Sequence, residues 1–298
     1  MAIKTLKTTI NGQEYDLTYS SSNGKWKATI TAPNKSSFNQ PGGYYNVTLK
    51  ATDDAGNTVT KDSTDTTLGD SLKLYVKEKV APTQSITYPT ANALITNNKP
   101  TITWEVRDDD SGVDPDTIKL TIDSNESITE GITKTPVSGG YDCSYTPSTT
   151  LADGQHTIKI DSADNDGNAS IQTSISFKID TVAPTLNVTS PTENFITNQS
   201  QITVEGTTND VTSSAVTVTI NDEPVTVQSN GSFSKQIHLS EGENTITVIA
   251  TDGAGKSTTV VRHVTLDTGG PVFKSVTITP NPVDGGQTFV IEVEVEDD

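Results

Sequence analysis

The sequence predicts an all-β protein made of tandem β-sandwich domains, on three observations. Thr alternates with Val and Ile in short runs, which is the two-residue period of a half-buried strand. Clusters of Asn, Asp and Gly separate these runs, at the spacing of about 8–12 residues that is typical of sandwiches. Hydrophobic residues make up only 31% of the chain and aromatic residues 5%, so several thin cores are expected rather than one large core.

One turn phrase occurs three times and is the strongest sign of internal repetition. Its copies read ATDDAGN at 51–57, SADNDGN at 162–168 and ATDGAGK at 250–256. Each copy follows an alternating run and precedes another run of the same kind. Asn and Gly tolerate positive φ at low cost, so such clusters form turns between strands. Each copy is therefore predicted to connect two strands of one domain.

Proline-containing linkers divide the chain into units of similar length. Val-Ala-Pro-Thr surrounds Pro82 and Pro184, and Gly-Pro-Val surrounds Pro271. Proline fixes φ and cannot donate to a sheet ladder, so we expect stiff joints at these points. The predicted domains are 1–79, 80–180 and 181–267, and 268–298 is an incomplete fourth. Joined in this way, the domains are expected to form an elongated rod.

The incomplete fourth domain contains two strand-like runs, 274–279 and 287–296. About 31 residues bury too little surface to fold alone. We therefore expect that the chain continues beyond residue 298 or that another chain completes this sheet.

The charge of the chain excludes some classes of partner and sets the first domain apart. Lys and Arg number 20 against 38 Asp and Glu, which gives a formal net charge of −18. Nucleic acids and anionic membranes require clustered Lys and Arg, so neither is an expected partner. Segment 1–79 alone carries a small positive charge, while the other three segments are acidic. This asymmetry favours docking of residues 1–79 onto an assembly, although charge also drifts between domains without a functional reason.

We expect neither an export signal nor a disulfide framework in this sequence. Residues 1–7, MAIKTLK, lack the apolar segment of a signal peptide, so export by the general secretory route is not expected. No apolar run approaches the roughly 18 residues that a membrane-spanning helix requires. Cys143 is the single cysteine, and the domains must hold without a covalent cross-link.

Six short motifs in one stretch of the chain resemble a known family. They are DTVAPT at 180–185, VEG at 204–206, VTVTIN at 216–221, NGSFS at 230–234, EGENTITV at 241–248 and DGAG at 252–255. With these motifs, residues 181–267 resemble bacterial Ig-like repeat domains, particularly those of the glucodextranase-domain-B-like kind. Segment 80–180 looks like a diverged relative through LADGQHTI at 151–158, whereas segment 1–79 shares only its turn phrase. The resemblance implies Ig-like sandwiches in tandem.

The layout as a whole also resembles tail-associated proteins of phages and prophages of Gram-positive bacteria. An unsignalled Met-Ala-Ile-Lys start followed by tandem Ig-like repeats is typical of that group. The resemblance implies a virion protein that assembles in the host cytoplasm and is then exposed outside the cell. It also implies many copies per particle.

A dense acidic stretch is the candidate metal site. Five carboxylates lie within residues 108–116, and we expect Asp108, Asp110, Asp114 and Asp116 as calcium ligands because calcium prefers hard oxygen ligands at short spacing. A second, sparser set contains Asp161, Asp164, Asp166 and Asn168. Neither set matches the twelve-residue calcium loop. The alternative is a solvated acidic loop with Asx turns and no cofactor at all.

Catalytic motifs are poorly represented, and an enzyme is not expected. Residues 250–257 fit a relaxed phosphate-loop pattern, but a strand-like run follows where the motif requires a helix. His156, His238 and His263 lie in strand-like runs without a partner at metal-ligand spacing. Cys143 is predicted to be a strand residue rather than a nucleophile.

Aromatic residues are the remaining sign of a binding surface. Tyr44 and Tyr45 are the expected glycan contacts, because planar rings stack on sugar faces. Trp26 and Trp104 alternate with polar neighbours and are predicted to face a core. The third domain has few aromatic residues and is predicted to be a spacer.

These observations together predict a non-enzymatic structural and adhesive arm on a phage tail or related particle. Residues 1–79 would dock to other virion proteins, and the acidic domains would make weak multivalent contacts with host cell-surface glycans. Two alternatives stay open: a carbohydrate-binding accessory region of a secreted glycan hydrolase, and a fragment of a bacterial surface adhesin.

Overall fold

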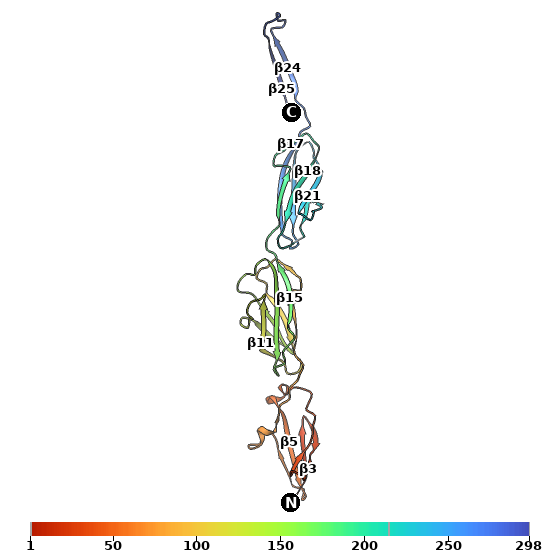
Figure 1. Ribbon diagram of the computed structural model, residues 1–298, viewed down its shortest axis with the longest axis vertical. Coiled ribbons are helices and arrows are strands. Elements are labelled where there is room, and N and C mark those ends of the chain that lie inside the picture. Colours follow the sequence, from red (N-terminus) through yellow and green to blue (C-terminus); the bar gives the residue numbers. More distant parts are fainter. Residues whose placement is uncertain (1, 214, 298) are drawn as a thin grey trace. The chain divides into compact units, whose positions relative to one another are not determined.

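The computed structural model describes residues 2–213 and 215–297, and it is built almost entirely from β-strands (Figure 1). Contacts divide the chain into two units, Met1–Ala93 with Asn97–Ile179, and Leu94–Thr96 with Asp180–Asp298. In the described residues, helical turns are limited to the short 3-10 helices η1 (Ser37–Asn39), η2 (Pro41–Gly43) and η3 (Gly69–Leu72). The expectation of an all-β fold is confirmed, and no helix of the described part is long and apolar enough to cross a membrane.

The first segment contains one larger sheet and a separate hairpin. The sheet has the order β2 (Gln13–Asp16), β1 (Ile3–Ile10), β5 (Tyr45–Asp53) and β6 (Thr58–Lys61), and β7 (Lys73–Leu74) pairs with β5. The hairpin consists of β3 (Thr18–Ser20) and β4 (Lys25–Lys27). A small core forms from Ile10, Tyr45 and Val76. This thin core agrees with the low hydrophobic content of the chain.

The second segment is a β-sandwich with a well-buried core. One sheet has the order β12 (Thr133–Val137), β13 (Gly140–Tyr145), β10 (Ile102–Arg107) and β8 (Thr83–Tyr88). The other contains β11 (Val113–Ile122), β14 (Gly154–Asp164) and β15 (Thr173–Ile179), while β9 (Leu94–Ile95) falls in the second contact unit. Side chains alternate between buried and half-buried along β10. The two-residue period therefore selects the core-facing residues, as the sequence predicts.

The third segment is a second sandwich. One sheet has the order β16 (Thr185–Ser190), β18 (Gln201–Asn209) and β21 (Ser232–His238). The other has the order β17 (Phe195–Thr197), β23 (Ser257–Leu266), β22 (Gly242–Thr251), β19 (Thr217–Ile220) and β20 (Glu223–Val225). The two sheets enclose one core, which includes Val204, Phe233 and Val248.

The turn phrase has the same hydrogen-bond pattern in all three copies. The first Asp of each copy accepts a hydrogen bond from the main-chain N–H four residues later, at 2.8 Å in Asp53, 2.7 Å in Asp164 and 2.8 Å in Asp252. The first copy joins β5 to β6 and the third joins β22 to β23. The phrase is thus a turn between strands, as predicted, and the relaxed phosphate-loop pattern at 250–257 lies in one of these turns.

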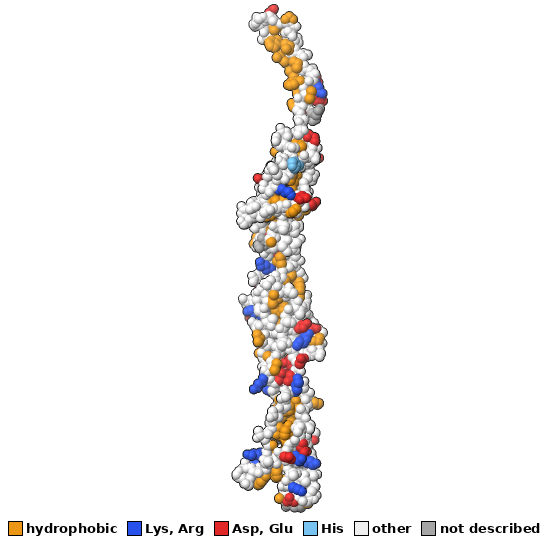
Figure 2. Space-filling view, turned by 90° about the vertical axis from the view of Figure 1, so that its right-hand side faces the viewer, with side chains coloured by type: hydrophobic (Ala, Val, Ile, Leu, Met, Phe, Trp, Pro, Cys, Tyr) orange, Lys and Arg blue, Asp and Glu red, His pale blue; other side chains and the backbone are white. Residues whose placement is uncertain are grey.

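Residues 268–297 form a single hairpin of β24 (Val272–Thr279) and β25 (Val290–Glu296). Every residue of both strands is exposed, including Phe273 and Val293. Figure 2 shows hydrophobic side chains gathered along this hairpin. The two predicted strands are present, and the expectation that further residues or another chain cover them stays a prediction.

Candidate functional site

Two groups of three carboxylates stand out among the described residues. Glu78, Asp108 and Asp164 form the first group, and Asp180, Asp210 and Asp252 form the second. Within each group, one oxygen from every residue lies within 4.8 Å of the others. Each group lies inside one contact unit. Such a density of acidic oxygens is typical of sites for hard cations.

The two groups occupy matching positions of consecutive repeats. Glu78 and Asp180 each precede the linker proline, Pro82 or Pro184, by four residues. Asp108 and Asp210 each follow that proline by 26 residues. The third member of each group is the first Asp of the repeated turn phrase. The repeat therefore brings a linker residue, a strand-end residue and a turn residue to one place in each sandwich.

Burial shapes the electrostatics of the first group. The Glu78 side chain is 9% exposed, and its Oε1 accepts a hydrogen bond of 2.5 Å from the Ser111 main-chain N–H. Burial raises the pKa of the Glu78 carboxyl above its ordinary value, and the charges of Asp108 and Asp110 raise it further, against the Ser111 hydrogen bond that lowers it. The group concentrates negative charge where water is scarce.

The protein itself supplies donors to the other two carboxylates of the first group. Asp108 Oδ1 accepts the main-chain N–H groups of Asp110, at 2.9 Å, and Gly112, at 2.8 Å. Asp164 Oδ1 accepts the Asn168 main-chain N–H, and Asp164 Oδ2 accepts the Asn168 side-chain amide at 2.6 Å. Three of the four oxygens of these two carboxylates therefore already have protein donors.

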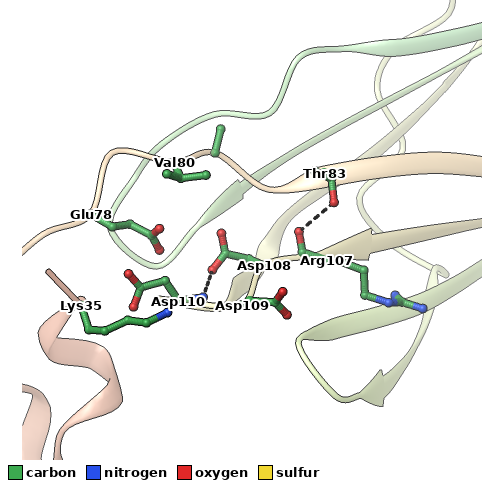
Figure 3. A pocket seen from close by; sticks show the side chains of 9 residues that line it. Lys35, Glu78, Val80, Thr83, Arg107, Asp108, Asp109 and Asp110 are labelled. Carbon is green, nitrogen blue, oxygen red and sulfur yellow. Dashed lines mark hydrogen bonds between the residues drawn. The ribbon is translucent and has the colours of Figure 1, made fainter.

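The first group borders the contact between segments 1–79 and 80–180. Asp110 Oδ1 accepts the Ser36 main-chain N–H at 2.9 Å and the Asn39 side-chain amide at 2.6 Å. A pocket of about 310 Å³ lies at this contact, and Figure 3 shows Lys35 reaching toward Asp110 there. The linker adds a further hydrogen bond, because the Glu78 main-chain N–H donates to Asp166 Oδ2 at 2.9 Å. Polar contacts therefore hold these two segments together.

The structure distributes the four expected calcium ligands over three places. Asp108 joins the first carboxylate group, while Asp110 binds the first segment. Asp114 Oδ1 accepts the Asp116 main-chain N–H at 3.0 Å, as in an Asx turn, and neither residue is among the three members of the group. The sequence interpretation missed Glu78 as a partner. The signal was available, because Glu78 and Asp180 share their offset from the linker prolines.

The two expected glycan-binding tyrosines differ in exposure. Tyr45 is 3% exposed in the first core and donates its hydroxyl hydrogen to the Lys35 carbonyl oxygen at 3.1 Å. The prediction of a glycan contact was wrong for Tyr45, because its ring is buried against Ile10 and Val76. Tyr44 is half-buried and meets the exposed Tyr75 edge to face, with ring centroids 6.3 Å apart. The Tyr44 contact stays a prediction.

The tryptophans and the cysteine are mainly structural. Trp104 is 1% exposed, so the prediction that it faces a core is confirmed. Trp26 is only half-buried and packs against Tyr19 with ring centroids 5.5 Å apart on the β3–β4 hairpin. Cys143 is a buried residue of β13, and burial raises the pKa of its thiol to about 11. The reactive thiolate is therefore scarce at neutral pH.

The three histidines lie in strands, as predicted, and each is hydrogen-bonded to a neighbour. His156 contacts Asp123 Oδ2 at 2.9 Å through Nδ1 and the Ala152 carbonyl oxygen at 2.7 Å through Nε2. His238 contacts Gln201 at 3.2 Å. His263 Nδ1 contacts Glu193 Oε1 at 2.7 Å. Protein contacts thus engage both ring nitrogens of His156 and one ring nitrogen each of His238 and His263.

The His263–Glu193 pair predicts a defined pH dependence. Its hydrogen bond raises the pKa of His263 above 6.5 and lowers the pKa of Glu193 below 4.5. The histidine contribution to stability is complete below pH 6.5 and disappears as the pH rises through the raised pKa. The glutamate contribution is complete above pH 4.5 and disappears as the pH falls through the lowered pKa. NMR titration should show that Glu193→Gln moves the His263 midpoint down toward 6.5, and an unchanged midpoint would contradict the assignment.

Family comparisons agree with the sandwiches that the sheets define. Residues 79–181 match the family described as "Bacterial Ig-like domain", and residues 184–268 match "Glucodextranase, domain B". The chain therefore contains Ig-like domains in tandem. The predicted resemblance to these repeats is confirmed, whereas the layout shared with phage tail proteins stays a prediction.

Individual proteins with similar regions differ widely in length and origin. Bacillopeptidase F of Bacillus subtilis (strain 168) is 29% identical over 126 residues, which are 42% of this chain and only 9% of that protein. Fibronectin(III)-like modules of Clostridium thermocellum CbhA superpose with a TM-score of 0.35 at 17% identity, over 62% of this chain and 94% of theirs. A three-domain Ig fragment of titin superposes with a TM-score of 0.42 at 14% identity, over 89% of this chain and 88% of the fragment. Because both TM-scores are below 0.5, the fold assignment rests on the sheets themselves.

Proposed function

We propose that the chain is a non-enzymatic structural and adhesive arm on a phage tail or related particle, making weak multivalent contacts with the host cell envelope. The contact between segments 1–79 and 80–180 carries this proposal. Asp110, Asp166 and the Glu78 main chain connect the two segments through direct hydrogen bonds. An arm that displays binding surfaces benefits from such contacts, because a pre-organised joint loses less conformational entropy on binding.

The state of the potentially reactive side chains supports a non-enzymatic role. The Cys143 thiol is buried and its pKa is raised to about 11. Both ring nitrogens of His156 contact protein acceptors. Nucleophilic catalysis requires an accessible nucleophile beside an available base, and these side chains serve structural contacts instead.

The aromatic pair of half-buried Tyr44 and exposed Tyr75 is the proposed glycan contact. The two rings lie edge to face, and Lys73 Nζ lies 5.2 Å from the centre of the Tyr44 ring. Tyr75 is 66% exposed and offers a planar apolar surface with a charged neighbour. Aromatic rings with a polar rim suit the faces of sugars. Acidic segments elsewhere in the chain would keep copies of the arm apart through mutual repulsion.

Multimeric display on cells tests this proposal. The full chain, fused to a multimerisation scaffold, should be retained on intact Gram-positive cells, and free wall glycan should compete that retention away. Tyr44→Ala and Tyr75→Ala should each reduce retention, whereas Tyr19→Ala, an exposed tyrosine of the same segment, should not. Failure of the multimer to bind any cell or glycan would contradict the adhesive part of the proposal.

A second candidate role is an accessory region of a secreted hydrolase or a surface adhesin. The match of residues 184–268 to a domain of glucodextranase and the similarity to Bacillopeptidase F favour it. The genes next to the one that encodes this chain distinguish the two roles. Adjacent tail genes would support the virion role, and a hydrolase or peptidase domain in the same reading frame would support the accessory role.

A further inference from the structure

The second carboxylate group contains an oxygen that the protein leaves without a partner. Asp252 is 6% exposed, and none of the described residues forms a hydrogen bond with its Oδ2 atom. Its Oδ1 atom accepts the Lys256 main-chain N–H at 2.8 Å. An unpaired buried carboxylate oxygen costs free energy, because burial removes the water that would otherwise solvate it.

Comparison with the other two copies of the turn phrase explains why Asp252 Oδ2 lacks a donor. In them, the residue four positions after the Asp is Asn, and its side-chain amide donates to the second carboxylate oxygen. Asn57 donates to Asp53 Oδ2 at 2.9 Å, and Asn168 donates to Asp164 Oδ2 at 2.6 Å. In the third copy this position is Lys256, which provides no amide donor. The free oxygen therefore arises from one residue difference within a repeated turn.

Two further carboxylates approach the same place. Asp180 is fully buried and Asp210 is half-buried, and one oxygen of each lies within 4.8 Å of a carboxylate oxygen of Asp252. Protein donors reach both residues, among them the Ser213 hydroxyl, which lies 2.6 Å from Asp180 Oδ2 and 3.3 Å from Asp210 Oδ1. Main-chain donors of Thr212 and Ser213 hold Asp210 Oδ1 in position. The three carboxylates are thus pre-oriented around one point.

We propose that Asp180, Asp210 and Asp252 bind one Ca²⁺ ion. The ligands are all hard oxygens, which excludes a preference for soft metals. Ca²⁺–oxygen distances of about 2.3–2.6 Å allow opposite ligands to stand up to about 5 Å apart, so oxygens within 4.8 Å of one another can share one ion. Mg²⁺ usually keeps several of its waters and binds through one or two carboxylates, so three converging carboxylates suit Ca²⁺ better. The ion neutralises three crowded negative charges and gives Asp252 Oδ2 its missing partner.

The site connects the linker to the sandwich within the second contact unit. Asp180 lies in the segment that enters β16, Asp210 follows β18 and Asp252 follows β22. A bound ion would hold these three segments together and slow their opening. This inference does not depend on the proposed adhesive role, because any use of the chain would involve the same stabilisation.

Hydrogen exchange of the full chain tests the proposal, with chelator-treated protein compared in CaCl₂, in MgCl₂ and without metal. Ca²⁺ should slow exchange in segments 180–182, 210–213 and 252–256, and should raise the melting temperature of the corresponding transition by about 5 °C or more. Mg²⁺ at the same concentration should produce a smaller response. No calcium-dependent protection in these segments, or equal protection by Mg²⁺, would overturn the assignment to Ca²⁺.

A matched pair of variants shows whether the calcium response arises at this carboxylate group. Asp252→Asn removes one ligand charge and should abolish the local calcium response. Asp53→Asn makes the same change in the first copy of the turn, where both oxygens already have Asn57 donors, and should leave the response intact. Retention of the full response by Asp252→Asn would overturn the proposal. The wild-type comparison decides the question even if Asp252→Asn proves too unstable to measure.

Discussion

Replacement of Trp104 by Ala should destabilise the second sandwich by about 3–5 kcal/mol, the range observed for buried aromatic residues. The side chain is 1% exposed in the centre of β10, with Ile102 and Val106 on the same face. Its loss removes a large apolar contact and leaves a cavity between two sheets that cannot close. Chemical unfolding monitored by hydrogen exchange in β14 and β15 measures this cost directly.

Trp26→Ala is the matched control for this prediction. Trp26 is half-buried on a two-stranded hairpin and contacts Tyr19, so its removal should cost no more than about 1.5 kcal/mol. Trp104→Phe should be milder than Trp104→Ala, because the indole N–H of Trp104 has no hydrogen-bond partner among the described residues. Equal effects of Trp104→Ala and Trp26→Ala would contradict the placement of Trp104 in the core.

Gly140→Ala should destabilise the same sandwich by about 3 kcal/mol or more, because two sources of strain add. Gly140 has φ of +154°, which side-chain-bearing residues rarely adopt. A Cβ atom at this position would also lie 2.1 Å from the Val106 carbonyl oxygen of the neighbouring strand. The β10–β13 pairing would have to open to relieve this overlap.

Gly154→Ala separates the two sources of strain. Gly154 also has a positive φ, +125°, but a Cβ atom there would meet nothing within 4 Å. Its replacement should therefore cost only the backbone strain, about 1–3 kcal/mol. Urea unfolding of both variants gives the comparison, and similar costs for the two would refute the close approach of β10 and β13.

The sequence predicted the fold well because the signals that define a sandwich are local. Alternation of apolar and polar residues identified β10 and placed Trp104 in a core. The repeated turn phrase identified the β22–β23 connection and excluded a phosphate loop there. Exposure of individual aromatic residues was harder to predict. Tyr45 begins β5 and Tyr44 directly precedes it in extended backbone, so their rings point to opposite sides, and the sequence does not specify which side is covered.

The candidate sites were predicted only in part because their members meet through tertiary structure. Asp108 was identified from its acidic neighbours, but its partners Glu78 and Asp164 lie 30 and 56 residues away in the chain. The second group has no dense acidic stretch, since Asp180, Asp210 and Asp252 are isolated from one another in the sequence. Asp180 and Asp210 share their offsets from the linker proline with Glu78 and Asp108, and Asp252 shares the turn phrase with Asp164.

The proposed structural arm requires a first joint, between segments 1–79 and 80–180, that polar contacts hold together. Distance distributions between spin labels at Thr60→Cys and Lys119→Cys test it most directly, because both positions are exposed and lie in different segments. The wild-type joint should give one narrow distribution, and Asp110→Ala should broaden it by removing the acceptor for Ser36 and Asn39. Asp109→Ala, an exposed neighbour with the same charge, should leave it narrow. A broad wild-type distribution that Asp110→Ala does not change would contradict the claim.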